Sequence, residues 1–482
     1  MSIKDINEEI ILIWCLELRL HIRVEQGIFY NNHFWLYAID TMRYYADLHI
    51  HSKYSRACSP KLTLENIDLW CRIKGISIVS CGDFTHPKWF QDIQEKLESE
   101  GNGLYRLKPS LRIKDFRFKE KKINDVHFII STELSCIYKH AGAVRRVHHC
   151  VFLPSLEAAA KLNNKLMEQG RNLKADGRPI LGLSSQELLK LLLEVDERSV
   201  LIPAHAWTPW FAIFGSKSGY NSIEECFGDL SKHVFAIETG LSSDPAMNWR
   251  LSKLDQVALV SHSDAHSLPN IGREADIFEG SELSYDNIMK AIKRGNPEAV
   301  VAGEDKLLPL KFTGTIEFFP DEGRYHFDGH RDCKIRLHPT ETIKRKGVCP
   351  TCGRELTLGV LYRVNELADR DPGFKPNGAS LYISLIELDK VIAQAQGVKG
   401  RQAKAVEAEY WNLVSYGGGE LQTLLDVPED ELSKITTTRV VEAIQRLRWG
   451  KVSIEPGYDG IYGIIDIFNT EEKIKQPQAS LF

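Results

Sequence analysis

The alternation of short apolar runs with helical patterns between residues 45 and about 300 is the feature that most restricts how this chain can fold. The runs that have the length and composition of buried strands are 45–50, 76–80, 127–131, 148–153, 199–205, 234–238 and 257–264. Many of the stretches between them, such as SLEAAAKLNNKLMEQG, have helical periodicity. Strands interleaved with helices indicate an α/β fold with parallel pairing, in an open sheet or a closed barrel. Because the strands end in polar or ionisable residues, we favour a barrel over residues 42–310, with its site at the C-terminal ends of the strands.

The segments on either side of this region have a different character. Residues 311–362 combine short β-like pieces with turns and the motif CPTCG, and we expect a small zinc-binding module there. Residues 363–470 are predicted to form a helical DNA-binding domain, and 471–482 a polar tail. Residues 1–41 show weak periodicity and are predicted to be an extension, with Met42 as a possible native start. A clamp or targeting arm is the alternative for 1–41.

Composition excludes several classes of protein. The 482 residues carry 61 Lys and Arg against 65 Asp and Glu, a net charge of −4, so contact with nucleic acid has to come from local patches. The ten cysteines form no disulfide framework, which favours a reducing compartment. No apolar run reaches the roughly 20 residues of a membrane span, and the start of the chain is too acidic for a signal peptide. We therefore expect a cytoplasmic protein with no membrane partner.

Residues 46–55, ADLHIHSKYS, open a series of metal-binding residue types. A period of two places His49 and His51 on one face of a strand, although such a pair alone is more often structural. Later strands end in further candidates: Asp83, His86, Glu133, His148, His149, His205, Asp264 and His266. Buried ionisable groups are costly unless they pair or bind metal, so a shared divalent-metal site explains them best. Clustered ions can activate a water and hold the oxygens of a phosphoester.

These motifs resemble those of the PHP family of metal-dependent phosphoesterases. The resemblance implies a distorted (β/α)7 barrel with two to three ions (Zn, Mn or Mg). It implies these ligand groups: His49, His51, Glu133 and Asp264 for one ion, Glu133, His148 and His205 for a second, Asp83 and His266 for a third. The usual third histidine after HIH is absent, and D-F-T-H replaces an adjacent Asp-His pair. These departures leave the third site and the role of His86 open. If 148–153 is a strand, His149 faces away from His148, and we expect it to be structural or to face DNA.

A second metal site is predicted near residue 340. His330-x2-Cys333 and Cys349-x2-Cys352 have the spacing of a closed tetrahedral site for one structural zinc. His338 or His326 could replace His330, which we prefer because His-x2-Cys mirrors the second half. The site either contacts nucleic acid or only stabilises a small module.

Local features point to nucleic acid. Arg145 and Arg146 precede His148 and are candidates for phosphate contact. Trp207, Trp210 and Phe211 follow His205 and could stack a base, or else form a hydrophobic lid. The basic stretch 106–122 could follow a phosphate backbone or be a solvated surface.

The last five residues, QASLF, resemble the peptide by which bacterial repair and replication proteins bind the sliding clamp. The resemblance implies that Gln478, Leu481 and Phe482 enter pockets of the clamp.

The order of barrel, zinc module and helical domain resembles endonuclease Q over essentially all of 42–482. The stretches that carry the resemblance are LIPAHAWTPWFAIFGSKSGY, FAIETGLSSDP, VSHSDAH and CPTCG. It implies a DNA-repair endonuclease that nicks damaged double-stranded DNA 5′ of uracil, hypoxanthine, xanthine or abasic sites, with Asp264, Glu133 and His205 in catalysis. The alternatives are a small-molecule phosphatase of the histidinol-phosphate type and a non-catalytic DNA-binding subunit.

Overall fold

The computed structural model describes residues 42–115, 117, 125–398, 400–469 and 472. Three predictions fall outside these residues. They concern the extension 1–41, the end of the basic stretch 106–122, and the tail peptide with Gln478, Leu481 and Phe482.

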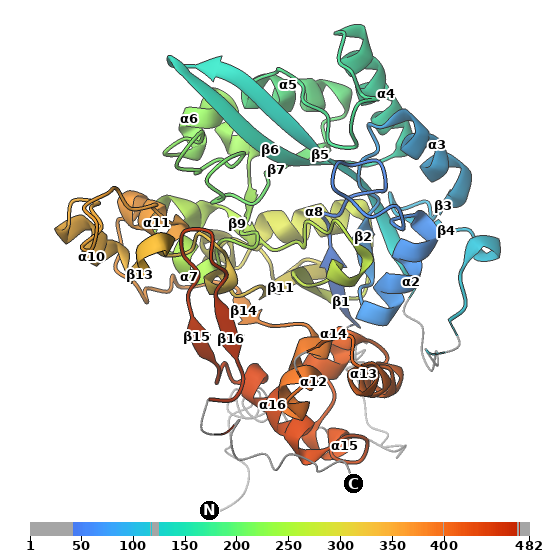
Figure 1. Ribbon diagram of the computed structural model, residues 1–482. Coiled ribbons are helices and arrows are strands. Elements are labelled where there is room, and N and C mark those ends of the chain that lie inside the picture. Colours follow the sequence, from blue (N-terminus) through green and yellow to red (C-terminus); the bar gives the residue numbers. More distant parts are fainter. Residues whose placement is uncertain (1–41, 116, 118–124, 399, 470–471, 473–482) are drawn as a thin grey trace, which may run out of the picture. The chain divides into compact units, whose positions relative to one another are not determined.

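A ten-stranded sheet of mixed direction forms the centre of the described chain (Figure 1). Its strands, in spatial order along the main path, are β14 (Leu381–Ser384), β11 (Leu310–Glu317), β10 (Ala275–Gly280), β1 (Met42–Asp47), β2 (Ile78–Ser80), β5 (His127–His140), β4 (Tyr105–Leu107) and β3 (Leu97–Ser99). The remaining two strands, β6 (Ala143–Leu153) and β7 (Val200–Pro203), continue the sheet from β5. A separate parallel pair consists of β8 (Ala236–Glu238) and β9 (Ala258–Val260). The strong alternation of apolar strands and helices thus produces the large α/β core that was predicted.

All seven predicted strands are present, but the expectation of parallel pairing is only partly correct. The pairs β1–β2, β2–β5 and β8–β9 are parallel, whereas β5, β6 and β7 run antiparallel to one another. The reason is a two-residue turn between β5 and β6, in which Ala141 and Gly142 have φ of 50° and 77°. Positive φ at both positions is the geometry that joins adjacent antiparallel strands. No helix separates β5 from β6, so these two strands form a hairpin rather than a crossover.

The sheet also extends beyond the predicted barrel. The expected border at residues 310–311 falls inside β11, which pairs with β10. From the region predicted to be helical, β14 adds a further parallel strand next to β11. Neither sequence pattern identifies a strand of the core sheet, because β14 has only four residues and β11 mixes its apolar residues with Lys, Thr, Gly and Glu.

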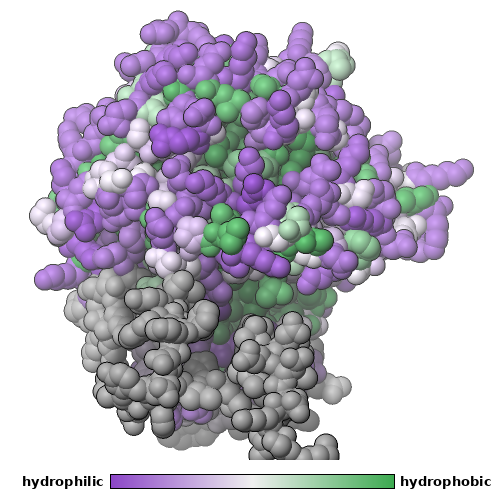
Figure 2. Space-filling view, turned by 180° about the vertical axis from the view of Figure 1, so that it is seen from behind, coloured by the Kyte–Doolittle hydropathy of each residue, from purple (hydrophilic) through white to green (hydrophobic). Residues whose placement is uncertain are grey.

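Helices cover the sheet and are bounded by standard capping residues. The main ones in this region are α2 (Leu64–Lys74), α3 (Pro87–Lys96), α4 (Leu156–Glu168), α5 (Ser185–Val195) and α8 (Tyr285–Arg294). Ser184 and Glu187 form a capping box at the start of α5, and Gly75 ends α2 in the left-handed conformation. None of the described helices is both long and apolar enough to cross a bilayer. On the face shown in Figure 2, apolar side chains occur in small groups among hydrophilic ones.

The C-terminal region is helical, as predicted. It contains α12 (Leu388–Gln396), α13 (Lys404–Gly417), α14 (Glu420–Leu425), α15 (Glu429–Leu432) and α16 (Thr438–Arg448), followed by β15 (Ser453–Glu455) and β16 (Ile464–Asp466). A buried ion pair joins it to α2, with 2.7 Å between Lys74 Nζ and Glu420 Oε2. In the sequence, β12 (Asp328–His330), β13 (Ile335–Leu337), α10 (Pro339–Lys344) and α11 (Val360–Leu367) follow β11 and precede β14.

Candidate metal centre

The predicted metal ligands lie on strands of the core or on the residues that directly follow them. His49 and His51 follow β1, on either side of a parallel bridge between Ile50 and Ala265. Asp83, His205 and Asp264 follow β2, β7 and β9, and their φ angles are 45°, 30° and 46°. Positive φ is uncommon for residues other than glycine and costs free energy that the surrounding structure has to supply. Its repetition at three predicted site residues indicates that the backbone is held in position for a function.

Glu133 on β5 lies at the centre of the site. Its Oε2 is 3.3 Å from His51 Nε2 and 3.6 Å from His49 Nε2. Its other oxygen, Oε1, is 2.7 Å from His148 Nδ1 and 3.1 Å from His205 Nε2. Each carboxylate oxygen therefore faces a different pair of histidines. The hairpin explains this arrangement, because the β5–β6 register places Ser135 opposite His148 and puts Glu133 and His148 on the same face.

Two groups of ligand atoms result, and each has its atoms within 4.8 Å of one another. They are His49, His51, Glu133 and Asp264, and Glu133, His148 and His205. Both correspond to ligand groups inferred from the PHP resemblance. We refer to the residues of both groups as the metal centre.

The donor set of the metal centre fits divalent cations. Imidazole and carboxylate groups are the ligands that such ions prefer. His49 Nε2 is fully buried and has no hydrogen-bond partner in the described structure, although it points toward Glu133 and Asp264. An unpaired buried nitrogen is costly, and a coordinated ion would satisfy it.

A second ring of polar residues orients these ligands. Asp83 accepts a hydrogen bond from His51 Nδ1 at 3.0 Å and from the backbone and hydroxyl of Ser52. Glu238 Oε1 lies 3.0 Å from His49 Nδ1, and its Oε2 accepts a hydrogen bond of 2.6 Å from the backbone N–H of His205. Carboxylates behind ligating histidines fix the ring and its tautomer. The centre is therefore held in place before any ion binds.

Sequence reasoning missed two residues of this ring. Glu238 ends the strand run FAIE as Glu133 ends HFIISTE, so the same pattern could have identified it. Arg178 lies in a loop, and its Nη1 is 2.8 Å from Glu133 Oε2. The sequence around Arg178 contains no motif that would identify it as a site residue.

The predicted third ion site is not assembled among the described residues. Asp83 faces His51 from behind, and His266 Nδ1 donates a 2.8 Å hydrogen bond to the carbonyl of Asp264. His86 stacks on Tyr54 with ring centroids 4.3 Å apart, away from both ligand groups. The sequence departs from the common PHP pattern at this site, which explains the missing arrangement.

His149, the other open residue, lies on the far face of β6. Its Nε2 is 2.8 Å from the Ser185 hydroxyl, and its ring packs against Phe227. It thus takes part in the core rather than in the metal centre.

The protonation of the centre reflects its negative charge. Burial lowers the pKa of His148 to about 4, so this ring is neutral and able to bind metal. Burial opposes charge on His51 as well, but Asp83 and Asp264 raise the pKa of His51 well above its usual range. Burial disfavours a charge on Glu133, but the Arg178 guanidinium and the hydrogen bonds to His148 and His205 outweigh it and hold the pKa of Glu133 well below its usual range. Binding of cations would displace protons from such a site.

The predicted zinc ligands also come together. The ligand atoms of His330, Cys333, Cys349 and Cys352 lie within 4.8 Å of one another, and we call these residues the four-ligand cluster. Burial opposes a thiolate at Cys349, but backbone N–H groups of Cys352 and Thr351 lower its pKa to about 6. His338 instead caps α10, and His326 is buried beside Asp321. The cluster therefore uses His330, and its four donors match a tetrahedral ion.

The predicted base-contacting aromatics differ in exposure. Trp207 is buried, and its indole donates a 2.8 Å hydrogen bond to Asn248, so the prediction that it contacts a base is wrong for this conformation. Trp210 is 46% exposed, and Phe211 lies over His148 with ring centroids 4.6 Å apart. These two remain accessible beside the metal centre.

The two predicted phosphate contacts also differ. Arg145 lies over the Tyr220 ring and donates a hydrogen bond to the carbonyl of Gly219, so its charged group is occupied within the protein. Arg146 is exposed, and its guanidinium lies 6.0 Å from the Phe211 ring centroid. Arg146 is the one that faces solvent next to the metal centre.

Comparison with known protein sequences finds relatives along most of the chain. Residues 387–451 match the family described as MJ0043 C-terminal domain. The protein MJ0043 of Methanocaldococcus jannaschii is 32% identical over 288 residues, which are 57% of this chain and 33% of that protein. The match thus spans about a third of that relative's length. YqxK of Bacillus subtilis is 28% identical over 434 residues, 87% of this chain and 98% of that protein.

Two solved structures share the fold. The lesion-specific endonuclease PfuEndoQ of Pyrococcus furiosus has a TM-score of 0.75 and 28% identity, covering 91% of this chain and 98% of its own. Endonuclease Q in complex with a 27-mer duplex substrate with an abasic lesion has a TM-score of 0.73 and 29% identity, covering 92% and 100%. Both agree with the large mixed sheet and the helical C-terminal region described above.

Both of these neighbours are endonucleases, and the likeness over nine-tenths of the chain confirms the prediction of a hydrolase. In its fold the chain is similar to endonuclease Q, as its motifs indicated.

Proposed function

We propose that this chain is a metal-dependent DNA endonuclease that nicks one strand on the 5′ side of a damaged base in DNA repair. Its substrates would be double-stranded DNA with uracil, hypoxanthine, xanthine or an abasic site. The similarity to endonucleases over nine-tenths of the chain supports the reaction class. The preference for deaminated bases rests on the motif resemblance.

The observation that carries this proposal is the position of the Glu133 carboxylate between two pairs of histidines. One oxygen faces His49 and His51, and the other faces His148 and His205. A carboxylate in this position can bridge two cations, which is the arrangement that phosphoester hydrolysis uses to hold the attacking and leaving oxygens. A (β/α)7 barrel of PHP type is the architecture we propose for the surrounding strands.

The two ligand groups of the metal centre would hold two ions, of Zn, Mn or Mg. Bound there, the ions would neutralise the phosphate and lower the pKa of a water. Asp264 and His205 complete the two groups, and the strained backbone at both residues keeps their side chains directed inward. Arg178 holds Glu133 through a 2.8 Å ion pair and is 26% exposed, so it can also approach a phosphate oxygen.

The substrate would approach along the exposed aromatics next to the metal centre. Trp210 offers a face on which an extruded base can stack, and Arg146 can contact the neighbouring phosphate. In the four-ligand cluster we propose one structural zinc. A cytoplasmic location remains a prediction.

A nicking assay tests the proposal. Labelled duplexes with a single uracil, hypoxanthine or abasic site are incubated with Mg²⁺, Mn²⁺ or Zn²⁺, and the cut position is read on a sequencing gel. We expect a nick 5′ of the lesion, and its loss in Asp264→Ala with DNA binding retained. His86→Ala is the matched control, because His86 lies outside both ligand groups and should leave nicking intact. Turnover of a sugar phosphate without any nick would refute the proposal in favour of a small-molecule phosphatase.

We propose the sliding clamp as a second partner, through the QASLF tail outside the described residues. Deletion of residues 478–482 should abolish capture by immobilised clamp while nicking of naked DNA continues. Undiminished capture would exclude this role of the tail.

A further inference from the structure

The loop 206–221 forms one wall of the metal centre. It follows His205, carries Trp210 and Phe211, and folds on itself through hydrogen bonds from Phe214 N to Ala206 O (2.9 Å) and from Tyr220 N to Ile213 O (2.6 Å). The carbonyl of Phe211 accepts a 3.0 Å hydrogen bond from the backbone N–H of His148. Any displacement of this loop therefore changes the surroundings of the centre.

A single arginine from a distant part of the chain holds this loop at two points. Arg363 on α11 donates from Nε to the carbonyl of Phe214 at 3.1 Å. Its Nη2 donates to the carbonyl of Tyr220 at 3.1 Å and to Asn221 Oδ1 at 2.7 Å. The side chain is only 12% exposed, and its remaining partner is Glu366 on the same helix. The rigid fork of a guanidinium suits such a multiple contact, and no other side chain reproduces it.

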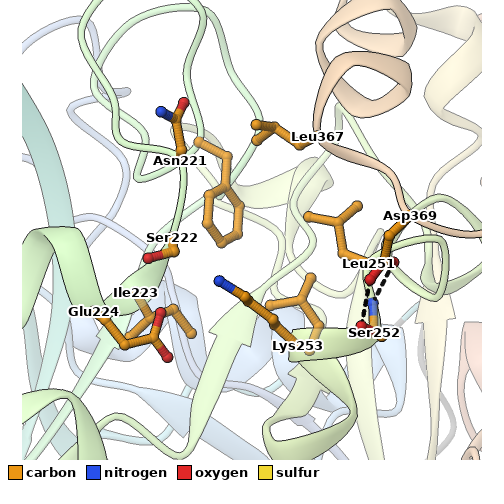
Figure 3. A pocket seen from close by; sticks show the side chains of 11 residues that line it. Asn221, Ser222, Ile223, Glu224, Leu251, Ser252, Lys253, Leu367 and Asp369 are labelled. Atoms are coloured by element: carbon orange, nitrogen blue, oxygen red, sulfur yellow. Dashed lines mark hydrogen bonds between the residues drawn. The ribbon is translucent and has the colours of Figure 1, made fainter.

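Packing alone leaves a gap between the loop and the end of α11. A cavity of about 230 Å³ lies there, lined by residues of the loop, by residues 222–224, by η3 (Ser252–Gln256) and by the end of α11. Figure 3 shows Ser222, Ile223 and Glu224 on one side of this cavity and Leu251, Ser252 and Asp369 on the other, with Lys253 extending between them. Because the apolar contact is incomplete at this cavity, the hydrogen bonds of Arg363 provide a direct polar link between the two elements.

The start of α11 is in turn attached to the four-ligand cluster. Gly359 N donates to Asp328 Oδ1 at 2.7 Å, and Thr357 pairs with Gly329 through two backbone hydrogen bonds of 2.9 Å. Strand β12, which contains Asp328 and Gly329, ends at the ligand His330. A Cβ on Gly359 would lie 2.4 Å from the carbonyl oxygen of His326, so the two segments touch without room for a side chain. His330 lies at the end of the first segment, and Cys352 precedes the second segment in the sequence. The four-ligand cluster therefore connects the two segments that touch here.

We infer that Arg363 is a positioning residue through which the four-ligand cluster controls the place of loop 206–221 beside the metal centre. The four ligands would hold an ion and thereby keep β12 against the start of α11. Helix α11 in turn positions Arg363, and Arg363 positions the loop. The effect on DNA cleavage rests on the function proposed above, whereas the effect on the loop does not.

Hydrogen exchange of the full-length protein without DNA tests the coupling. We expect amide exchange in peptides covering 208–221 to become about ten-fold faster in Arg363→Ala and in Cys352→Ser. Peptides from α4 and α5 should exchange at the original rate, which shows that the fold persists. Gly359→Ala keeps all four ligands but pushes α11 from residues 326–327, so it should have the same effect even if Cys352→Ser folds poorly.

Two variants serve as matched controls. Glu366→Gln removes only the ion pair of Arg363 within α11 and leaves its three hydrogen bonds to the loop, so exchange should not change. His338→Ala alters a histidine close to the four-ligand cluster that is not one of its ligands, so loop exchange should again stay the same. Unchanged loop exchange in Arg363→Ala, or in both Cys352→Ser and Gly359→Ala, would overturn the inference.

Enzyme kinetics provide a second test of the positioning role of Arg363. In Arg363→Ala, kcat/KM on a lesion-containing duplex should fall about ten-fold or more, because a small displacement of a substrate-positioning group has a large effect. Hydrolysis of a small phosphodiester such as bis(p-nitrophenyl) phosphate, which is too small to need positioning by the loop, should fall by a much smaller factor. Equal losses on both substrates would contradict a positioning role. Absence of any nicking by the unaltered protein would refute the proposed function and leave the exchange result standing.

Discussion

At the scale of single residues, the metal centre depends on carboxylates that differ in position and therefore in role. Glu133 lies between the histidines, whereas Glu238 lies behind His49 and His205 and also contacts His262 at 2.9 Å. Both side chains are fully buried, so water cannot take the place of the histidines they contact. Glu133 is expected to bind the ions, and Glu238 is expected to orient the histidines that bind them.

The variants Glu133→Gln and Glu238→Gln should separate these roles. Glu238→Gln should weaken metal affinity and nicking about 10-fold to 100-fold, the usual effect of removing an orienting group. Glu133→Gln should reduce metal affinity and nicking by a larger factor, because it removes the charge of the bridging carboxylate. Calorimetric metal titration with parallel nicking rates measures both effects. A larger loss in Glu238→Gln than in Glu133→Gln would contradict the assignment.

Glu317 provides a test of pH dependence away from the ligands. Burial raises its pKa to about 8, while its carboxyl contacts Thr239, Ser261 and Thr315. The folded chain keeps this group protonated up to about pH 8, whereas the unfolded chain loses the proton near its ordinary pKa of 4.5. Its contribution to stability is therefore complete below pH 4.5 and decreases as the pH rises toward 8.

Glu317→Gln cannot ionise and should remove this decrease. We expect its free energy of unfolding relative to the unaltered protein to rise steadily between pH 5 and pH 8 in urea titrations. A constant difference across that range would show that Glu317 does not titrate there.

At the scale of elements, the β5–β6 hairpin determines which residues reach the centre. It places Glu133 and His148 on one face and His149 on the other. Its turn contains Ala141 at φ 50°, a conformation that costs an alanine about 1 kcal/mol or more.

Ala141→Gly should relieve this strain and stabilise the protein by about 0.5–1 kcal/mol. Ala143→Gly, in the adjacent strand with ordinary φ, is the control and should destabilise. Midpoints of urea unfolding measure both. Destabilisation by Ala141→Gly would contradict the turn geometry.

At the scale of the whole molecule, the helical region is joined to the sheet by buried charges. Glu420 accepts hydrogen bonds from Lys74, Tyr410 and the backbone of Leu388. A buried pair of this kind adds little stability by itself, but removal of one partner leaves the other uncompensated.

Lys74→Met should therefore destabilise the protein by about 3–5 kcal/mol, more than the double variant Lys74→Met/Glu420→Leu. Chemical denaturation of both variants measures the difference. If the double variant were the less stable of the two, the pair would contribute net stability in this protein.

The sequence by itself determined the strands, the capped helices and the residue types at the strand ends. These features follow from local periodicity and turn chemistry, which depend only on residues close together in the sequence. It also indicated His330, Cys333, Cys349 and Cys352, because fixed spacing restricts how a metal cluster can form.

Only the tertiary structure decided the pairing directions, the extra strands of the sheet and the second ring around the metal centre. Glu238, Arg178 and Arg363 act on the metal centre and on loop 206–221 through partners that are 33 to 189 residues away in the chain. Contacts of this kind depend on how strands and loops pack in three dimensions, and no local pattern of apolar and polar residues records them. Burial likewise removed Trp207 from the candidate base contacts, although it lies in the same aromatic stretch after His205 as Trp210.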